Sequence, residues 1–104
     1  MIYRQGDVLI SIAASMPQGL KPIAPSARGY VIAEGEATGH AHVATGTEIH
    51  LYEDEHGTLW LRVGGDGGSV IHEEHETVAL PVGDYHITHQ REWTDDDEPR
   101  RVID

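Results

Sequence analysis

Short segments in which apolar and polar residues alternate recur along most of the chain. In residues 8–12 and 58–63 an aliphatic residue occupies every second position, which is the pattern of a β-strand with one buried face. No stretch repeats its apolar residues convincingly at helical spacing. The strands predicted in this way are residues 8–12, 29–34, 40–44, 48–53, 58–63, 69–74, 77–80 and 85–93.

Glycine and proline separate these segments. Residues 15–26 contain Pro17, Pro22 and Pro25 and are predicted to form a loop, because proline is excluded from the interior of a regular sheet. Gly46 is expected to end one strand. The local sequence also predicts a hairpin turn at 54–57, a flexible glycine-rich turn at 64–68, and a central strand at 29–34, which is apolar on both faces.

These elements predict an all-β fold, a single small β-barrel or sandwich of about eight short strands. The chain of 104 residues fits one domain, residues 1–104, and we expect its acidic and then basic end, residues 94–104, to be frayed. The 12 glycines and the absence of phenylalanine are typical of a turn-rich β protein with a mainly aliphatic core.

The formal net charge of -11, from 18 acidic and 7 basic residues, argues against a nucleic-acid partner. Phosphate binding needs clustered lysine and arginine, which this chain lacks. The sequence has no cysteine, which excludes thiol chemistry and favours a reducing compartment. It also has no apolar signal region and no segment apolar enough to cross a membrane. We therefore expect a cytoplasmic protein without a membrane partner.

Eight histidines are the most unusual feature of the composition. His40 and His42 are two positions apart, so on a strand they project to the same face, at a spacing suited to chelating one ion. Gly39 allows the backbone to turn tightly just before them. Imidazole and carboxylate ligands together suit a divalent transition metal, and we expect Zn, Fe, Mn or Ni as the cofactor.

A second dense group is His72-Glu73-Glu74-His75. His72 and His75 would face opposite sides of a straight strand, so they converge only if the chain bends between them, at a bulge or a strand end. Glu73 and Glu74 are then candidates for metal ligands, for partners of an imidazole N–H, or for the general base of a catalysed reaction.

Two short motifs resemble those of a known family. Residues 39–42 read Gly-His-Ala-His, and residues 81–86 read Pro-Val-Gly-Asp-Tyr-His. Their order resembles the cupin superfamily, which consists of small β-barrels with an H-x-H pair, a downstream glutamate and a later histidine after P-x-G. The resemblance implies a cupin-like, jelly-roll barrel whose metal ligands are His40, His42, Glu48 and His86.

The chain also resembles small uncharacterised bacterial and phage proteins. The resemblance includes Tyr-Arg-Gln-Gly-Asp-Val at residues 3–8 and Gln-Arg-Glu-Trp at residues 90–93, and it brings no known function.

The third metal ligand stays open between His72, His75 and His86. A strand end would allow the bend that the second histidine group needs, which favours His75.

These features indicate a metal-binding protein with a histidine-rich site. Catalysis is left open: as a metal-dependent enzyme the protein would act on a small-molecule substrate, with Glu73 or Glu74 as the proton acceptor. One alternative is a non-catalytic, homo-oligomeric ligand-binding module, for which Trp60 and Arg62 are candidate interface residues. Another is a pH-responsive interaction module that uses the protonation of clustered histidines.

Overall fold

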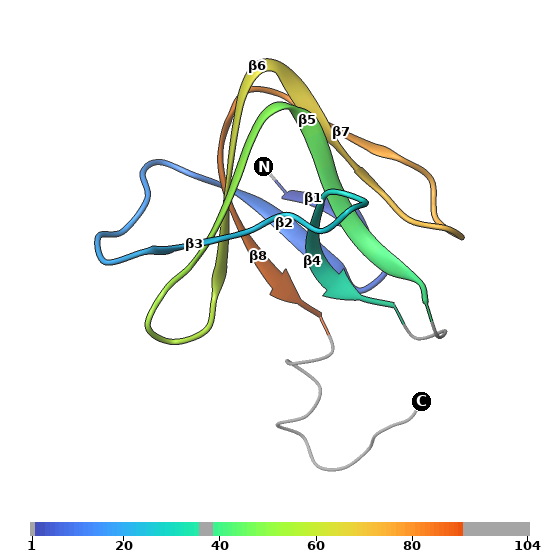
Figure 1. Cartoon of the computed structure of the whole chain (residues 1–104), viewed down its shortest axis with the longest axis horizontal. Helices are drawn as coiled ribbons and strands as arrows, with labels where there is room; N and C mark the ends of the chain where they lie inside the picture. Colours follow the sequence, from blue (N-terminus) through green and yellow to red (C-terminus); the bar gives the residue numbers. More distant parts are fainter. Residues whose placement is uncertain (1, 36–38, 91–104) are drawn as a thin grey trace.

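The computed structural model describes residues 2–35 and 39–90 (Figure 1). Within these residues it has eight β-strands, all in one antiparallel sheet, and the predicted all-β class is confirmed. The described residues contain no helix that could span a membrane. The strands are β1 (Ile2–Gln5), β2 (Val8–Ala13), β3 (Lys21–Ile23), β4 (Tyr30–Glu34), β5 (Ala41–Glu53), β6 (Leu59–Ile71), β7 (Val78–Leu80) and β8 (Gly83–His89).

β5 and β6 form one long hairpin with 13 residues in each strand. Its turn follows Asp54, whose Oδ1 accepts hydrogen bonds from the amides of His56 and Thr58, both at 2.9 Å. Gly57 lies in this turn with a φ of 85°, a conformation that a side chain would strain. The predicted hairpin turn at residues 54–57 is therefore confirmed.

The hairpin bends sharply at its glycines. We predicted that Gly46 and residues 64–68 would interrupt the strands, and this is wrong, because both lie inside continuous strands of the β5–β6 ladder. A bulge follows Gly46 in β5, and two of the glycines in β6 have positive φ. A Cβ on Gly68 would lie 2.8 Å from the side chain of Ile49. Glycine thus permits the close approach that a bent ladder requires, and the bend forms the crest of the molecule in Figure 1.

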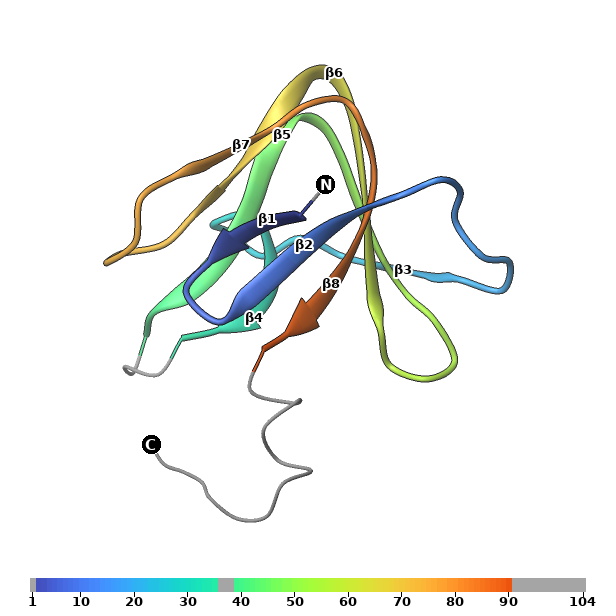
Figure 2. The ribbon, with the colours of Figure 1, turned by 180° about the vertical axis from the view of Figure 1, so that it is seen from behind.

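The bend divides the sheet into two arms, which Figure 2 shows from behind. The broad arm contains, in order, β1, β2, β8, the first part of β6, the last part of β5, and β3. The narrow arm contains β4, the first part of β5, the last part of β6, and β7. The sheet is folded over at the crest, and no barrel closure is detected among the described residues.

One hydrophobic core joins the two arms. The predicted inward faces of the strands are confirmed at Leu61, Val63, Tyr85 and Ile87, all of which are buried. Tyr85 also donates its hydroxyl hydrogen bond to the Pro81 oxygen at 2.6 Å, and burial raises the pKa of this phenol. The buried members of the core are Val8, Ile10, Ile32, Ala33, Ala44, Ile49, Leu51, Leu61, Val63, Val70, Leu80, Tyr85 and Ile87.

The edges of the sheet differ from the prediction. We expected β4 to be central, but among the described residues it pairs only with β5. A register shift between Val31 and Ala33 lets the consecutive residues Ile32 and Ala33 both be buried, so both faces of β4 look apolar in the sequence.

Two edge strands were not predicted at all. β3 lies inside the supposed loop 15–26, and its Pro22 is tolerated because proline is compatible with an edge strand. β1 has an exposed Ile2 and a buried Gln5, so its apolar pattern gives no signal. The strand predicted for residues 85–93 corresponds to β8, whereas residues 91–93 and the supposedly frayed tail 94–104 lie outside the described residues.

Gln5 links the two arms where β1 approaches β7. Its side-chain Nε2 donates hydrogen bonds to the Val70 oxygen at 2.9 Å and to the Glu76 oxygen at 2.8 Å. Gln5 is only 3% exposed, so both bonds form away from bulk water. This one amide therefore connects the end of β1 in the broad arm with the strand and loop that precede β7 in the narrow arm.

Replacing this amide should destabilise the fold. In a Gln5→Leu variant the Val70 and Glu76 oxygens lose their donor, and each buried group left without a partner costs about 1–3 kcal/mol. We expect the free energy of unfolding, measured by urea denaturation, to fall by about 3 kcal/mol. Gln18→Leu is the matched control, because Gln18 is exposed and should shift the midpoint little. Equal effects of the two substitutions would contradict a structural role for the Gln5 amide.

Candidate metal centre

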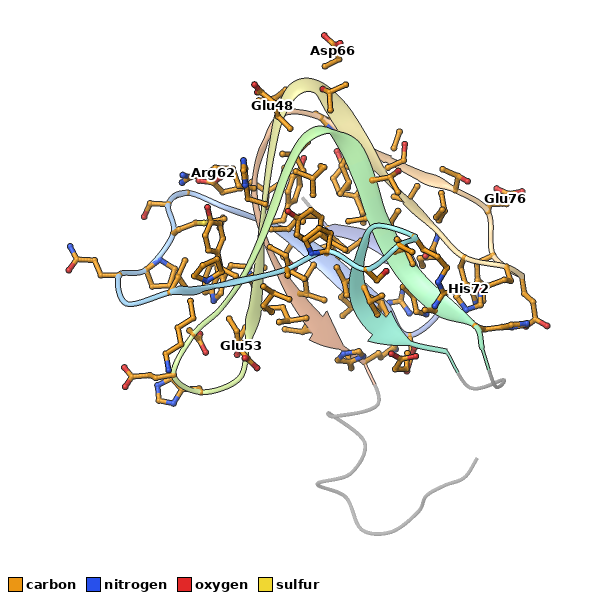
Figure 3. The ribbon with its side chains drawn as sticks, viewed as in Figure 1. Glu48, Glu53, Arg62, Asp66, His72 and Glu76 are labelled. Atoms are coloured by element: carbon orange, nitrogen blue, oxygen red, sulfur yellow. The ribbon has the colours of Figure 1, made fainter. Side chains whose placement is uncertain are left out.

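Four histidine rings gather at the end of the narrow arm. His40 immediately precedes β5 and His42 lies near its start, and His72 and His75 follow the end of β6. The centroid of the His72 ring lies 4.4 Å from that of His42, 4.6 Å from that of His75 and 5.8 Å from that of His40. We call these four residues the histidine cluster, and His72 marks its place in Figure 3.

The register of the hairpin explains why the two sequence motifs meet. Val43 pairs with Ile71, so the next positions along the two strands, His42 and His72, lie beside each other on the same side of the narrow arm. The strand ends at Ile71, and the chain then turns, which brings His75 back to within 5.9 Å of His42 between ring centroids. The bend required between His72 and His75 is therefore present, at a strand end.

Two glycines make room for the rings. A Cβ on Gly6 would lie 2.9 Å from His75 Nε2, and a Cβ on Gly35 would lie 2.9 Å from His72 Nε2. Gly6 belongs to the β1–β2 turn of the broad arm, where its φ is 63°. The contact of Gly6 with the site was not predicted. The turn at Gly6-Asp7 is recognisable from the local sequence, but the contact of Gly6 with His75 joins residues that are far apart in the sequence.

The orientation of His42 is fixed by Gln5. Both N–H groups of the Gln5 amide are donated to backbone oxygens, so its Oε1 is left to accept, and it lies 2.8 Å from His42 Nδ1. His42 Nδ1 must therefore carry the ring proton, which leaves a lone pair on Nε2. Burial lowers the pKa of His42 to about 4, with the neighbouring His72 contributing in the same direction. His42 is thus neutral at pH 7.

His40 Nδ1 is buried and lacks a hydrogen-bond partner within the described part of the chain. No described residue makes a hydrogen bond to His40 Nδ1, and the nearest carboxylate oxygen recorded for it is Glu74 Oε2 at 3.9 Å. Buried polar atoms normally have a hydrogen-bond partner, so such an atom requires an explanation, and a bound ion is one of the recognised ones. The Glu74 side chain is largely exposed.

Glu73 is held by two donors. Its Oε1 accepts a hydrogen bond from the Ala41 amide at 3.0 Å, and its Oε2 pairs with Arg28 Nη1 at 3.0 Å. The hydrogen bond from Ala41 is the main cause that lowers the pKa of Glu73, and the positive charge of Arg28 acts in the same direction. Glu73 is therefore an ionised carboxylate of fixed orientation at neutral pH.

Three of these residues form a group that could hold a metal ion. One donor atom each of His40, His72 and Glu73 lies within 4.8 Å of the other two. A set of two imidazoles and one carboxylate is used by both zinc and non-haem iron centres. The predicted pairing of the two histidine motifs thus produces a candidate triad, although its members are neither the H-x-H pair nor the set implied by the cupin resemblance.

The remaining candidates lie elsewhere. His86 lies in β8 with its ring centroid 5.3 Å from that of Trp60, and the structure does not bring it into the histidine cluster. Glu48 lies at the crest of the bend, opposite Gly64, and Figure 3 places it apart from His72. Of the predicted interface pair, Trp60 donates a hydrogen bond to Asp54, and Arg62 forms a two-pronged ion pair with Asp84.

Comparison with known proteins identifies a family without identifying an activity. Residues 4–90 match the family described as Domain of unknown function (DUF8820), and the chain belongs to that family. This match does not support an assignment to the cupins. No curated protein and no solved structure matches the chain significantly.

The low pKa of His42 should make the fold sensitive to acid. The unfolded chain binds a proton at His42 near pH 6.5, whereas the folded chain binds it only near pH 4. His42 therefore contributes fully above pH 6.5, and its contribution is lost as the pH falls from about 6.5 to about 4. The expected loss in the free energy of unfolding is about 3 kcal/mol, measured by urea denaturation across that range.

A substitution can isolate this contribution. His42→Gln should flatten the pH dependence between pH 6.5 and pH 4 even if it lowers the stability at every pH. His50→Gln is the matched control, because His50 is exposed and lies outside the cluster. An unchanged slope in His42→Gln would show that another group causes the acid sensitivity.

Proposed function

We propose that this protein binds one divalent transition-metal ion through His40, His72 and Glu73. The observation that carries the proposal is the approach of their three donor atoms to within 4.8 Å of one another. The buried Nδ1 of His40, which has no hydrogen bond to a described residue, supports it independently. The acidic chain, with its net charge of -11, also favours the accumulation of cations.

The roles within the centre follow from the hydrogen bonds. Glu73 serves as an anionic ligand, because its low pKa keeps it ionised and unsuited to accept a proton at neutral pH. The Ala41 amide and Arg28 orient its carboxylate, as outer partners commonly do for a metal ligand. His42 stays neutral beside the centre, so it adds no positive charge that would repel the ion.

Metal binding at His72 requires a local rearrangement. The Glu74 amide donates a hydrogen bond to His72 Nδ1 at 3.0 Å, so the neutral ring carries its proton on Nε2. Coordination through Nε2 moves that proton to Nδ1, and coordination through Nδ1 displaces the amide directly. Either route breaks this bond, and the Glu74 amide signal in an NMR spectrum should therefore shift on metal binding.

Three protein ligands leave coordination positions open. In such centres the open positions hold water or a substrate, and the ion polarises what it binds. Glu74 is the better placed of the two glutamates to accept a proton, because its carboxylate is exposed and lies 3.9 Å from His40 Nδ1. We therefore infer a metal-dependent protein acting on a small molecule, with Zn, Fe, Mn and Ni as the candidate ions.

Removal of a ligand should abolish stoichiometric metal binding. We expect protein purified without a histidine tag to bind one equivalent of Zn²⁺ or Co²⁺ by isothermal titration calorimetry. His40→Ala and His72→Ala should each weaken binding by more than the roughly 10- to 100-fold that is typical of losing an outer partner. His50→Ala and His56→Ala are the controls, because both remove an exposed histidine outside the cluster.

Two outcomes would contradict the proposal. One is wild-type protein that binds less than one equivalent of every candidate ion. The other is an equal loss of affinity in the cluster variants and in the controls, which would indicate unspecific binding to surface histidines. Circular dichroism of each variant checks that the β fold is intact.

A further inference from the structure

A pocket adjoins the candidate metal centre in the narrow arm. It has a volume of about 360 Å³ and is lined by Arg28, Ala41, Val43, Ile71, His72 and Glu73. Sites for small ligands begin at roughly 300 Å³, so this pocket suits a molecule of a few carbon atoms. His72 and Glu73 are members of the candidate triad, so a ligand in the pocket would lie next to the ion.

The floor of the pocket is aliphatic. Val43 and Ile71 are cross-strand partners, and Ala41 lies two positions from Val43 on the same face. Neither Ala41 nor Val43 belongs to the core between the arms, although both are buried. Ile71 stays 39% exposed, which leaves apolar surface for a ligand to cover. This floor favours a short hydrocarbon body.

The rim of the pocket presents a fixed guanidinium. Arg28 Nη1 donates hydrogen bonds to the Gly39 oxygen at 3.1 Å and to Glu73 Oε2 at 3.0 Å. Both bonds to described residues use Nη1, and the side chain is 47% exposed. The remaining N–H groups can therefore donate to a planar anion, for which the guanidinium geometry is well suited.

Charge then selects the head group of the ligand. Without an ion, Arg28 and Glu73 balance each other at the pocket. A divalent ion at the triad adds two positive charges, so the pocket becomes a site for an anion that contacts both the ion and Arg28. A carboxylate supplies two oxygens for these two contacts, whereas an alcohol supplies one and carries no charge.

We propose that this pocket binds a small monocarboxylate with a short aliphatic chain, its carboxylate between the ion and Arg28 and its chain on Ile71 and Val43. This inference rests on the proposed metal centre. It assigns the class of ligand, and it gives Arg28 a role in binding the ligand besides its role in orienting Glu73.

The experiment uses the full chain loaded with Co²⁺, whose visible absorption responds to new ligands. Acetate, butanoate, hexanoate and butan-1-ol are titrated separately, after Co²⁺ binding has been measured alone. We expect the three carboxylates to change the spectrum, with an affinity that rises about two- to fourfold per methylene. Butan-1-ol should leave the spectrum unchanged.

Matched variants test the two halves of the pocket. Arg28→Gln should weaken butanoate binding at least tenfold, whereas Arg62→Gln removes an arginine of similar exposure in an ion pair with Asp84 and should have no effect. Ile71→Ala should remove part of the gain per methylene. Val82→Ala, which truncates another exposed aliphatic residue, should leave that gain intact.

The outcomes separate the two proposals. Failure of Co²⁺ to bind would overturn both the metal centre and the pocket assignment. Stoichiometric Co²⁺ binding without a response to carboxylates, or with equal binding by Arg28→Gln and Arg62→Gln, would overturn only the pocket assignment. A response to butan-1-ol equal to that to butanoate would show that charge does not select the ligand.

Discussion

The Gln5 amide is the interaction on which both the fold and the site depend. Its two N–H groups bind backbone oxygens of the narrow arm, and these bonds leave its oxygen only one role, that of acceptor for His42. The same side chain thus joins the two arms and fixes which nitrogen of His42 carries the proton. A local change at this amide would reach the histidine cluster through His42, without touching a member of the candidate triad.

Close packing imposes a second constraint, and glycine satisfies it. Gly6 and Gly35 allow the backbone to approach His75 and His72 more closely than any side chain would permit. The glycines of β6 serve the same end at the crest, where the hairpin folds over. The hairpin brings the two histidine motifs together, and the Gly6 turn brings the start of the chain against them.

Alternation of apolar residues predicts strands well, but it does not distinguish a turn from a bend. Residues 64–68 contain no apolar side chain that would indicate a buried face, so a hairpin turn and a bent strand look alike in the sequence. The two histidine motifs were predictable for a similar local reason, since each is dense within a few residues. The contact of Arg28 with Glu73 joins positions 45 residues apart and leaves no local signal. His86 shows the opposite case. It matches a short sequence motif, but the motif does not determine to which face of the sheet its ring projects, and the ring lies beside Trp60.

The electrostatic state of the site favours a cation over a proton as its ligand. Burial holds the pKa of His42 near 4, so this ring stays neutral through the mildly acidic range. Glu73 stays ionised because the Ala41 amide and Arg28 stabilise its charge. Neutral imidazoles and an ionised carboxylate are the protonation states that a metal requires of its ligands. The fold therefore maintains at neutral pH an ionised ligand at Glu73, through Ala41 and Arg28, and an uncharged neighbour at His42, which Gln5 orients.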